Sequence, residues 1–206
     1  MQVRPDRKDP LMKPALLVML VLAAGAISAQ APAGGGQRAG GPPAPQMTLT
    51  STGFQEGAQI PVRFTQAGEQ VSPALAWTNT PPGTQSFVLH MHDMEVARNR
   101  TTEDQVHWLV WNIPGSVTGL PEGVPKGETL ADGSRQISAS GAVYRGPGAP
   151  ATGPPHHYVF EIYALDTRLD VPAAADAFLT RTEVMKAMQG HVLGKAVLLG
   201  LFRRPQ

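Results

Sequence analysis

Carboxylates and imidazoles cluster around two apolar stretches in the middle of the chain. Residues 87–93 (FVLHMHD) end in Asp93, and residues 106–113 (VHWLVWNI) carry His107 near their start. Both stretches predict strands, and the polar segment 95–105 between them predicts an exposed loop. If the strands are neighbours, Asp93 and His107 meet at one end of a sheet. With Glu95 they could act as an acid/base set, or form a structural hydrogen-bonded cluster.

Two further histidines lie on the first of these strands. Strand residues two apart share a face, so His90 and His92 point to the face opposite Asp93. This spacing can ligate Zn or Cu, but it also suits imidazoles that are simply packed in a sheet. Spacing identifies no third ligand, so we predict neither a metal site nor a cofactor.

The segment 144–157 is a Gly- and Pro-rich loop that ends in two histidines. Successive backbone N–H groups in such a loop can form a concave anion-binding site, and imidazoles can add donors. The alternative is an ordinary crossover loop. No serine lies in a nucleophile-elbow context, which argues against a serine hydrolase.

The chain has 206 residues, of which 42% are hydrophobic, and its formal net charge is only +1. A chain of this length can bury one sizeable core. A nearly neutral chain argues against nucleic acid as the main partner, because binding to phosphates needs clustered cations. The absence of cysteine excludes disulfides, thiolate metal sites and cysteine catalysis.

The first 31 residues resemble an export signal: a basic start, the apolar run 14–27, and then small residues around Ala29 and Ala31. The alternative is an uncleaved N-terminal anchor, and Met12 could be the true start. Residues 32–46 are rich in Gly, Pro and Ala and predict a disordered linker. We therefore expect one folded domain at 47–206, located in the periplasm or secreted.

The remaining elements that must position the polar residues are mostly short strands. The patterns predict strands at 47–51, 60–64, 71–77, 136–140, 156–165 and 192–202. A helix is predicted to begin at Thr180 as N-cap, with Glu183 completing a capping box and Gly190 ending the helix. A weaker helical segment covers 173–179. Many short strands with turn signals between them indicate a mainly β, sandwich-like domain with a few short helices.

Several separated strings then match one family in order and spacing. The sequence resembles the phosphatidylethanolamine-binding protein family, in its bacterial kinase-inhibitor-like branch, and the resemblance covers about residues 47–204. It rests on the strings at 72–77 (SPALAW), 92–95, 107–114, 144–147 (YRGP), 156–160 (HHYVF), 163–166, 190–193 and 200–203.

The resemblance implies a Greek-key β-sandwich with a small anion pocket for phosphate-like or carboxylate groups, including phospholipid headgroups. Carried over by position, the pocket residues are Asp93, Glu95, His107, Tyr144, Gly146, Pro147 and His156. Two departures from the family pattern affect the wall of this pocket. The D-P-D-A-P segment is Asp93-Met94-Glu95-Val96-Ala97 here, without either proline, and the G-P-C-P-P loop has lost its cysteine. We expect Asp93 to orient His107 and to favour its protonated form, so that anions bind more strongly at mildly acid pH.

These observations favour a non-catalytic binding protein for a small anionic ligand or lipid headgroup, with peripheral membrane contact and a monomeric or homodimeric state both possible. The first alternative is an inhibitor or interaction protein that acts on an extracytoplasmic enzyme such as a protease. The second is a hydrolase that uses Asp93 and His107, for which no nucleophile or metal is evident in the sequence.

Overall fold

The computed structural model describes residues 46–173 and 175–206. The predicted export signal at 1–31 and all but the last residue of the predicted linker at 32–46 lie outside the described residues. Within the described ranges, no helix combines the length and apolar character needed to cross a membrane.

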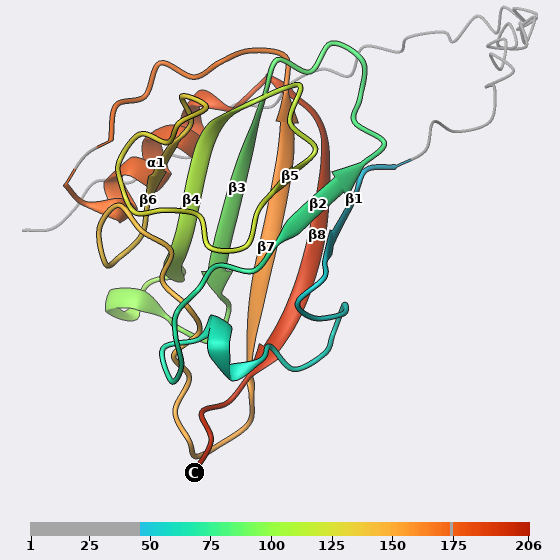
Figure 1. Cartoon of the computed structure of the whole chain (residues 1–206). Coiled ribbons are helices and arrows are strands. Elements are labelled where there is room, and N and C mark those ends of the chain that lie inside the picture. Colours follow the sequence, from blue (N-terminus) through green and yellow to red (C-terminus); the bar gives the residue numbers. More distant parts are fainter. Residues whose placement is uncertain (1–45, 174) are drawn as a thin grey trace, which may run out of the picture. The chain divides into compact units, whose positions relative to one another are not determined.

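Two antiparallel sheets make up the domain (Figure 1). The small sheet has the order β1-β2-β5, and the large sheet has the order β6-β4-β3-β7-β8. The strands are β1 (Thr48–Ser51), β2 (Leu75–Thr78), β3 (Ser86–Asp93), β4 (Gln105–Pro114), β5 (Gly119–Leu120), β6 (Arg135–Ile137), β7 (His156–Leu165) and β8 (Val192–Phe202). The predicted mainly β fold is confirmed, and β3 and β4 are neighbours as expected.

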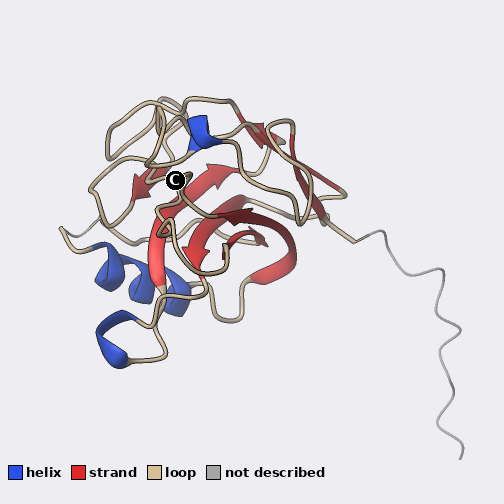
Figure 2. Cartoon of the chain, turned by 90° about the horizontal axis from the view of Figure 1, so that it is seen from below, coloured by secondary structure: helices blue, strands red, loops and turns tan. Residues whose placement is uncertain are grey.

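The central strands β3 and β4 of the large sheet are buried on both faces, which explains why they read as nearly continuous apolar runs. One face packs against the small sheet through a core that includes Trp77, Phe87 and Trp108. The other face packs against the helix α1 (Ala177–Ala187), and that second core includes Trp111 and Val184. Figure 2 shows α1 on one side of the large sheet and the small sheet on the other.

The predicted strand at 60–64 is wrong. Residues Val62–Phe64 form a 3₁₀ helix, η1, in which Phe64 N–H donates to the Pro61 carbonyl at 3.0 Å. Pro61 has no N–H to donate to a neighbouring strand, so pairing stops at Ile60, whose N–H donates to Leu201. Two strands are also shorter than predicted, since β2 starts only at Leu75 and β6 ends at Ile137. The sequence patterns did not predict the two-residue strand β5, which pairs with β2.

The predicted helix start at Thr180 is also wrong. Asp176 is the N-cap, and its carboxylate accepts from the N–H groups of Phe178 and Leu179. Thr180 instead lies buried inside the first turn, where its hydroxyl donates to the Asp176 carbonyl. Aspartate is as good an N-cap as threonine, and capping from Asp176 adds a turn to the helix. Gly190 does adopt the left-handed conformation beyond the helix end, with a φ of 84°.

A second 3₁₀ turn, η2 (Arg98–Arg100), lies in the loop between β3 and β4. The guanidinium of Arg98 lies 3.3 Å from the centre of the Phe178 ring on α1. This contact ties the β3–β4 loop to the helix that covers the far face of the large sheet.

Candidate functional site

A β-bulge brings Asp93 and His107 to the same face of the large sheet. Met91 pairs with Trp108, whereas His92 pairs with Val106, so His107 is an extra residue on β4. Simple alternation would turn His107 away from the face that Trp108 occupies. The bulge lets both consecutive residues face the small-sheet side, where the His107 ring meets Tyr158 edge-on at 5.1 Å.

The buried carboxylate of Asp93 pairs with His156 rather than with His107. The Nδ1 atom of His156 lies 2.9 and 3.1 Å from the two carboxylate oxygens of Asp93. The backbone N–H of Glu95 donates to the same carboxylate at 3.1 Å. The predicted orientation of His107 by Asp93 is therefore wrong: β7, the other neighbour of β3, supplies the imidazole that reaches this carboxylate.

His107 is held by backbone carbonyls. Its Nδ1 lies 3.0 Å from the Arg145 oxygen and 3.1 Å from the Gly146 oxygen, so Nδ1 carries the proton and donates. Burial lowers the pKa of His107, and the favourable effects of the carbonyls and of Asp93 do not compensate for it. Asp93 does favour imidazolium at this position, as expected, but burial outweighs its charge and the ring is not held protonated. In the neutral form, Nε2 is left as an acceptor.

These residues line a cavity of about 200 Å³ between the sheet end and two loops. The lining residues are Gln66, Asp93, Val96, Gln105, His107, Arg145, Gly148, Ala149, Pro150, His156 and Tyr158. Burial, with the nearby Asp93 carboxylate second, raises the pKa of Tyr158, and its hydroxyl accepts from the Gly148 N–H at 3.1 Å. The cavity is therefore polar at its walls but small.

Three of the predicted pocket residues lie in the wall behind the lining. The Tyr144 hydroxyl donates to the Phe64 carbonyl at 2.8 Å, and the Pro147 carbonyl accepts from Gln66 N–H at 2.9 Å. A Cβ at Gly146 would lie 2.4 Å from the Phe64 oxygen, so only glycine fits there. These contacts fix the Gly-Pro loop against η1 and place residues 148–150 at the cavity.

Glu95 points to the rim and engages a different histidine. Its carboxylate accepts from the backbone N–H of His157 at 2.7 Å and lies 2.6 Å from the Nδ1 of the same residue. These hydrogen bonds outweigh the effect of partial burial and lower the pKa of Glu95. Glu95 does not line the cavity, although its carboxylate lies within 4.8 Å of the Asp93 carboxylate and the His156 imidazole.

Sequence reasoning missed Arg145, Tyr158 and Gln66. Tyr158 follows His156 by two positions on β7 and therefore shares its face, a signal that the alternation already contained. Arg145 stands between two predicted residues of the loop, and its charge was a second available signal. Nothing local marks Gln66, which reaches the site only because η1 packs on the loop: its side-chain amide donates to the Gly146 carbonyl at 2.7 Å.

Two groups of side chains in the described residues have donor atoms close enough to share a metal ion, within 4.8 Å of one another. One is Asp93, Glu95 and His156 at the cavity. The other is His90, His92 and Glu161 on the opposite face of the sheet. The cavity group already satisfies its donors internally, because the imidazole of His156 pairs with Asp93.

The family model described as phosphatidylethanolamine-binding protein matches residues 50–203. A UPF0098 protein of Methanothermobacter thermautotrophicus is 42% identical over 160 residues, which are 77% of this chain and 99% of that protein. A UPF0098 protein of Aquifex aeolicus is 34% identical over 77% of this chain and 89% of its own length.

Solved structures agree with these sequence matches. A phosphatidylethanolamine-binding protein homologue from Chlamydia trachomatis superposes with a TM-score of 0.65 at 28% identity, over 77% of this chain and 98% of that one. YbcL of Escherichia coli, described as a new member of the mammalian family, superposes with a TM-score of 0.64 at 25% identity, over 78% and 99% of the two chains.

Proposed function

The chain belongs to the phosphatidylethanolamine-binding protein family, and from this premise we propose that it is a non-catalytic binding protein for a small anionic group. The group is phosphate-like or a carboxylate, either free or at the end of a larger molecule such as a lipid. A cavity of about 200 Å³ suits such a group better than a whole lipid or a drug-sized ligand, which needs roughly 300 Å³ or more.

One observation carries this proposal: Arg145 brings a cation to the cavity that is not neutralised. Its Nε is buried without a hydrogen-bond partner among the described residues. Its Nη1 makes only a long contact of 3.4 Å to the Ser140 hydroxyl, and no carboxylate in the described ranges forms an ion pair with it. A guanidinium left with free donors at a cavity wall is suited to bind a carboxylate or phosphate through paired hydrogen bonds.

The imidazole of His107 complements this cation. Because its Nδ1–H is engaged by the loop carbonyls, Nε2 is the ring atom available to a ligand. Neutral Nε2 can accept from the hydroxyl of a monoprotonated phosphate, and protonated Nε2–H can donate to a fully ionised oxygen. The same ring therefore serves either protonation state of a phosphate-like group.

The cavity supports binding better than catalysis. Its described lining contains no serine, threonine, lysine or cysteine. The hydrolase alternative needs Asp93 to activate His107, but Asp93 pairs with His156. The sequence pattern of residues 1–31 supports placing this binding function in the periplasm or outside the cell, with an extracytoplasmic protein partner as the alternative role for the same surface.

Calorimetric titration of the full chain tests the proposal, with phosphate, sulfate, phosphoethanolamine and acetate as separate ligands. Arg145→Gln should weaken binding by roughly 10- to 100-fold, which corresponds to the loss of hydrogen bonds between charged groups. Arg204→Gln, an exposed arginine near the C-terminus, is the matched control and should bind like the wild type. Phosphoethanolamine bound no better than phosphate would indicate recognition of the anion alone. Wild-type protein that binds none of the four ligands would contradict the proposal.

A further inference from the structure

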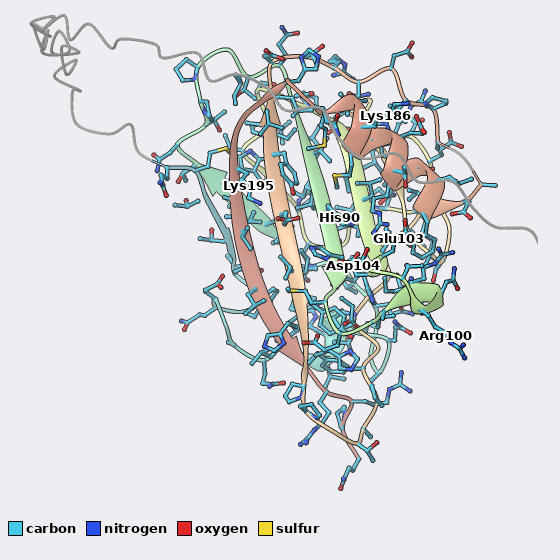
Figure 3. The ribbon with its side chains drawn as sticks, turned by 180° about the vertical axis from the view of Figure 1, so that it is seen from behind. His90, Arg100, Glu103, Asp104, Lys186 and Lys195 are labelled. Carbon is cyan, nitrogen blue, oxygen red and sulfur yellow. The ribbon has the colours of Figure 1, made fainter. Side chains whose placement is uncertain are left out.

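A second polar cluster lies on the other face of β3, between the large sheet and α1. His90 and His92 project from β3 to this face, and Glu161 of β7 is the direct cross-strand partner of His90. The two imidazole rings are stacked, with centroids 4.6 Å apart and planes 2° from parallel. Figure 3 shows this side of the molecule, with His90 and Asp104 labelled close together.

One nitrogen of each imidazole in this cluster, Nε2, has no hydrogen-bond partner among the described residues. His90 is only 5% exposed, and its buried Nε2 has no hydrogen-bond partner among the described residues. The Nε2 of His92 is likewise buried and without a hydrogen bond there. A buried polar atom without a partner destabilises the fold by about 1–3 kcal/mol, so two in one place require an explanation.

The distance between His92 and Glu161 suits a shared ion, and one of the two stacked imidazole rings has to turn so that both nitrogen lone pairs point at that ion. The Nε2 of His92 lies 3.6 Å from an Oε2 oxygen of Glu161, too far for a good hydrogen bond. Two ligands on one tetrahedral Zn²⁺, each bonded at about 2.0–2.2 Å, stand about 3.3–3.5 Å apart. His90, His92 and Glu161 each offer one ligand atom, a ring nitrogen or a carboxylate oxygen, within 4.8 Å of the other two.

Neighbouring side chains fix the tautomer of His92 and keep Glu161 ionised, as metal binding requires. The Nδ1 of His92 is hydrogen-bonded to Asp104, whose carboxylate is held at 2.9 Å by Arg181 of α1. A carboxylate on Nδ1 fixes the tautomer that frees Nε2 for a metal. The Glu161 carboxylate accepts from Tyr163 and Lys195 at 2.8 and 2.9 Å, and it remains ionised.

We propose that the Nε2 atoms of His90 and His92 and a carboxylate oxygen of Glu161 form a site for a divalent transition-metal ion of the Zn²⁺ class. Two imidazoles and one carboxylate are a common ligand set for such ions. The adjoining open pocket, about 330 Å³ and lined also by Thr102 and Met185, leaves room for water or a further ligand at the remaining coordination position.

Charges of both signs surround the three ligands. The Asp104 carboxylate lies beside His92, while Arg181 and Lys195 bring positive charge to Asp104 and Glu161. A spectroscopic readout is therefore needed beside affinity, because it distinguishes coordination by the imidazoles from electrostatic attraction of a cation to the carboxylates.

The experiment uses the untagged full chain after removal of metals with a chelator. Zn²⁺ is titrated calorimetrically, and Co²⁺ is added separately as a probe whose visible absorption reports coordination geometry. We expect one ion per chain with a four- or five-coordinate Co²⁺ spectrum. Glu161→Gln and His92→Gln should each reduce affinity by more than the roughly 10- to 100-fold effect of losing an outer partner.

His156→Gln is the matched control, because it removes an imidazole from the other group of metal-compatible side chains. It should leave Zn²⁺ affinity and the Co²⁺ spectrum unchanged. Urea unfolding of each metal-free variant checks that it folds, and either of the two ligand variants suffices if the other does not. The proposal is overturned if wild-type protein binds Zn²⁺ no better than millimolar, if Glu161→Gln keeps full affinity, or if His156→Gln abolishes binding.

Discussion

The two faces of β3 carry two histidine clusters that differ in almost every physical respect. On the small-sheet face, Asp93 and the imidazoles of His107 and His156 surround a small cavity. On the helix face, His90 and His92 lie against Glu161 and Asp104. One strand builds both because its side chains alternate, with Asp93 on one side and His92 on the other. The chemistry of each cluster is then decided by the neighbouring elements.

The groups around each imidazole determine its pKa. His107 meets two carbonyls, and burial lowers its pKa. Partial burial acts to lower the pKa of His92 as well, but the carboxylates of Asp104 and Glu161 outweigh it and raise that pKa to about 9. Deep burial, with the charge of His92 second, lowers the pKa of His90 to about 3. A histidine in a sequence therefore indicates little about its charge until its neighbours are known.

The largest expected effect concerns His92 in metal-free protein. Its pKa is about 9 when folded and 6.5 in the unfolded chain, so its contribution to stability is complete below pH 6.5 and is lost as the pH rises through 9. This difference corresponds to about 3 kcal/mol. We expect the free energy of unfolding, measured by urea titration in the presence of a chelator, to fall by that amount between pH 6.5 and 9.5.

His92→Gln is the variant that isolates this effect. It should be less stable than wild type at pH 6.5 and should show a flatter dependence on pH up to 9.5. A wild-type protein whose stability does not change over this interval, or a variant with an unchanged slope, would show that His92 is not charged in the fold. The two faces of β3 would then not differ in the way described.

The next effect concerns the loop that shapes the cavity. In Gly146→Ala, the new Cβ would meet the Phe64 carbonyl oxygen at 2.4 Å and the backbone of Thr65 at 2.8 Å. Overpacking against backbone costs about 1–3 kcal/mol, and we also expect phosphate binding to weaken because the loop must move. Gly148→Ala is the matched control, since the three atoms nearest to its new Cβ are all at the end of the Gln66 side chain rather than in the backbone, and it should destabilise less. Equal losses in urea unfolding would contradict this account.

The pH dependence of anion binding tests the cavity directly. Because burial lowers the pKa of His107 in the free protein, its protonation, and with it stronger binding of a fully ionised anion, should begin only below the ordinary value of 6.5. Sulfate is the suitable ligand, since its own charge is constant over this range. We expect affinity to rise by at most about tenfold per pH unit for one proton taken up.

His107→Gln should remove the part of the pH dependence of sulfate affinity that comes from protonation of His107. Calorimetric titrations between pH 5 and 8 measure both proteins, and His92→Gln serves as a control on the opposite face. A sulfate affinity that peaks near neutral pH, or an unchanged slope in His107→Gln, would assign the pH dependence to another group.

Most strands could be predicted because their alternation and turn signals are local. The segments 156–165 and 192–202 match β7 and β8 residue for residue. The errors occurred where a competing local signal or a distant partner decides. Pro61 ends pairing and allows η1, and Asp176 caps α1 ahead of the capping box at Thr180.

The pocket was harder to predict than the fold. The bulge that turns His107 depends on register between β3 and β4, which no single residue specifies. The pairing of Asp93 with His156 depends on β7 lying on the other side of β3. For the same reason, the HxH spacing alone could not identify Glu161, which cross-strand pairing with β7 supplies.

The smallest expected effect tests whether the helix face and the cavity are independent. Asp176→Ala removes the cap of α1 and should cost about 1 kcal/mol of stability. Because α1 carries Arg181, which holds Asp104 against His92, a frayed helix should weaken Zn²⁺ binding modestly. Sulfate affinity should stay unchanged, since no α1 residue lines the cavity.

Glu183→Ala, which removes the residue that the sequence pattern predicted to complete the cap, is the control and should behave like wild type. A change in sulfate affinity in Asp176→Ala would show that the two faces of β3 are coupled.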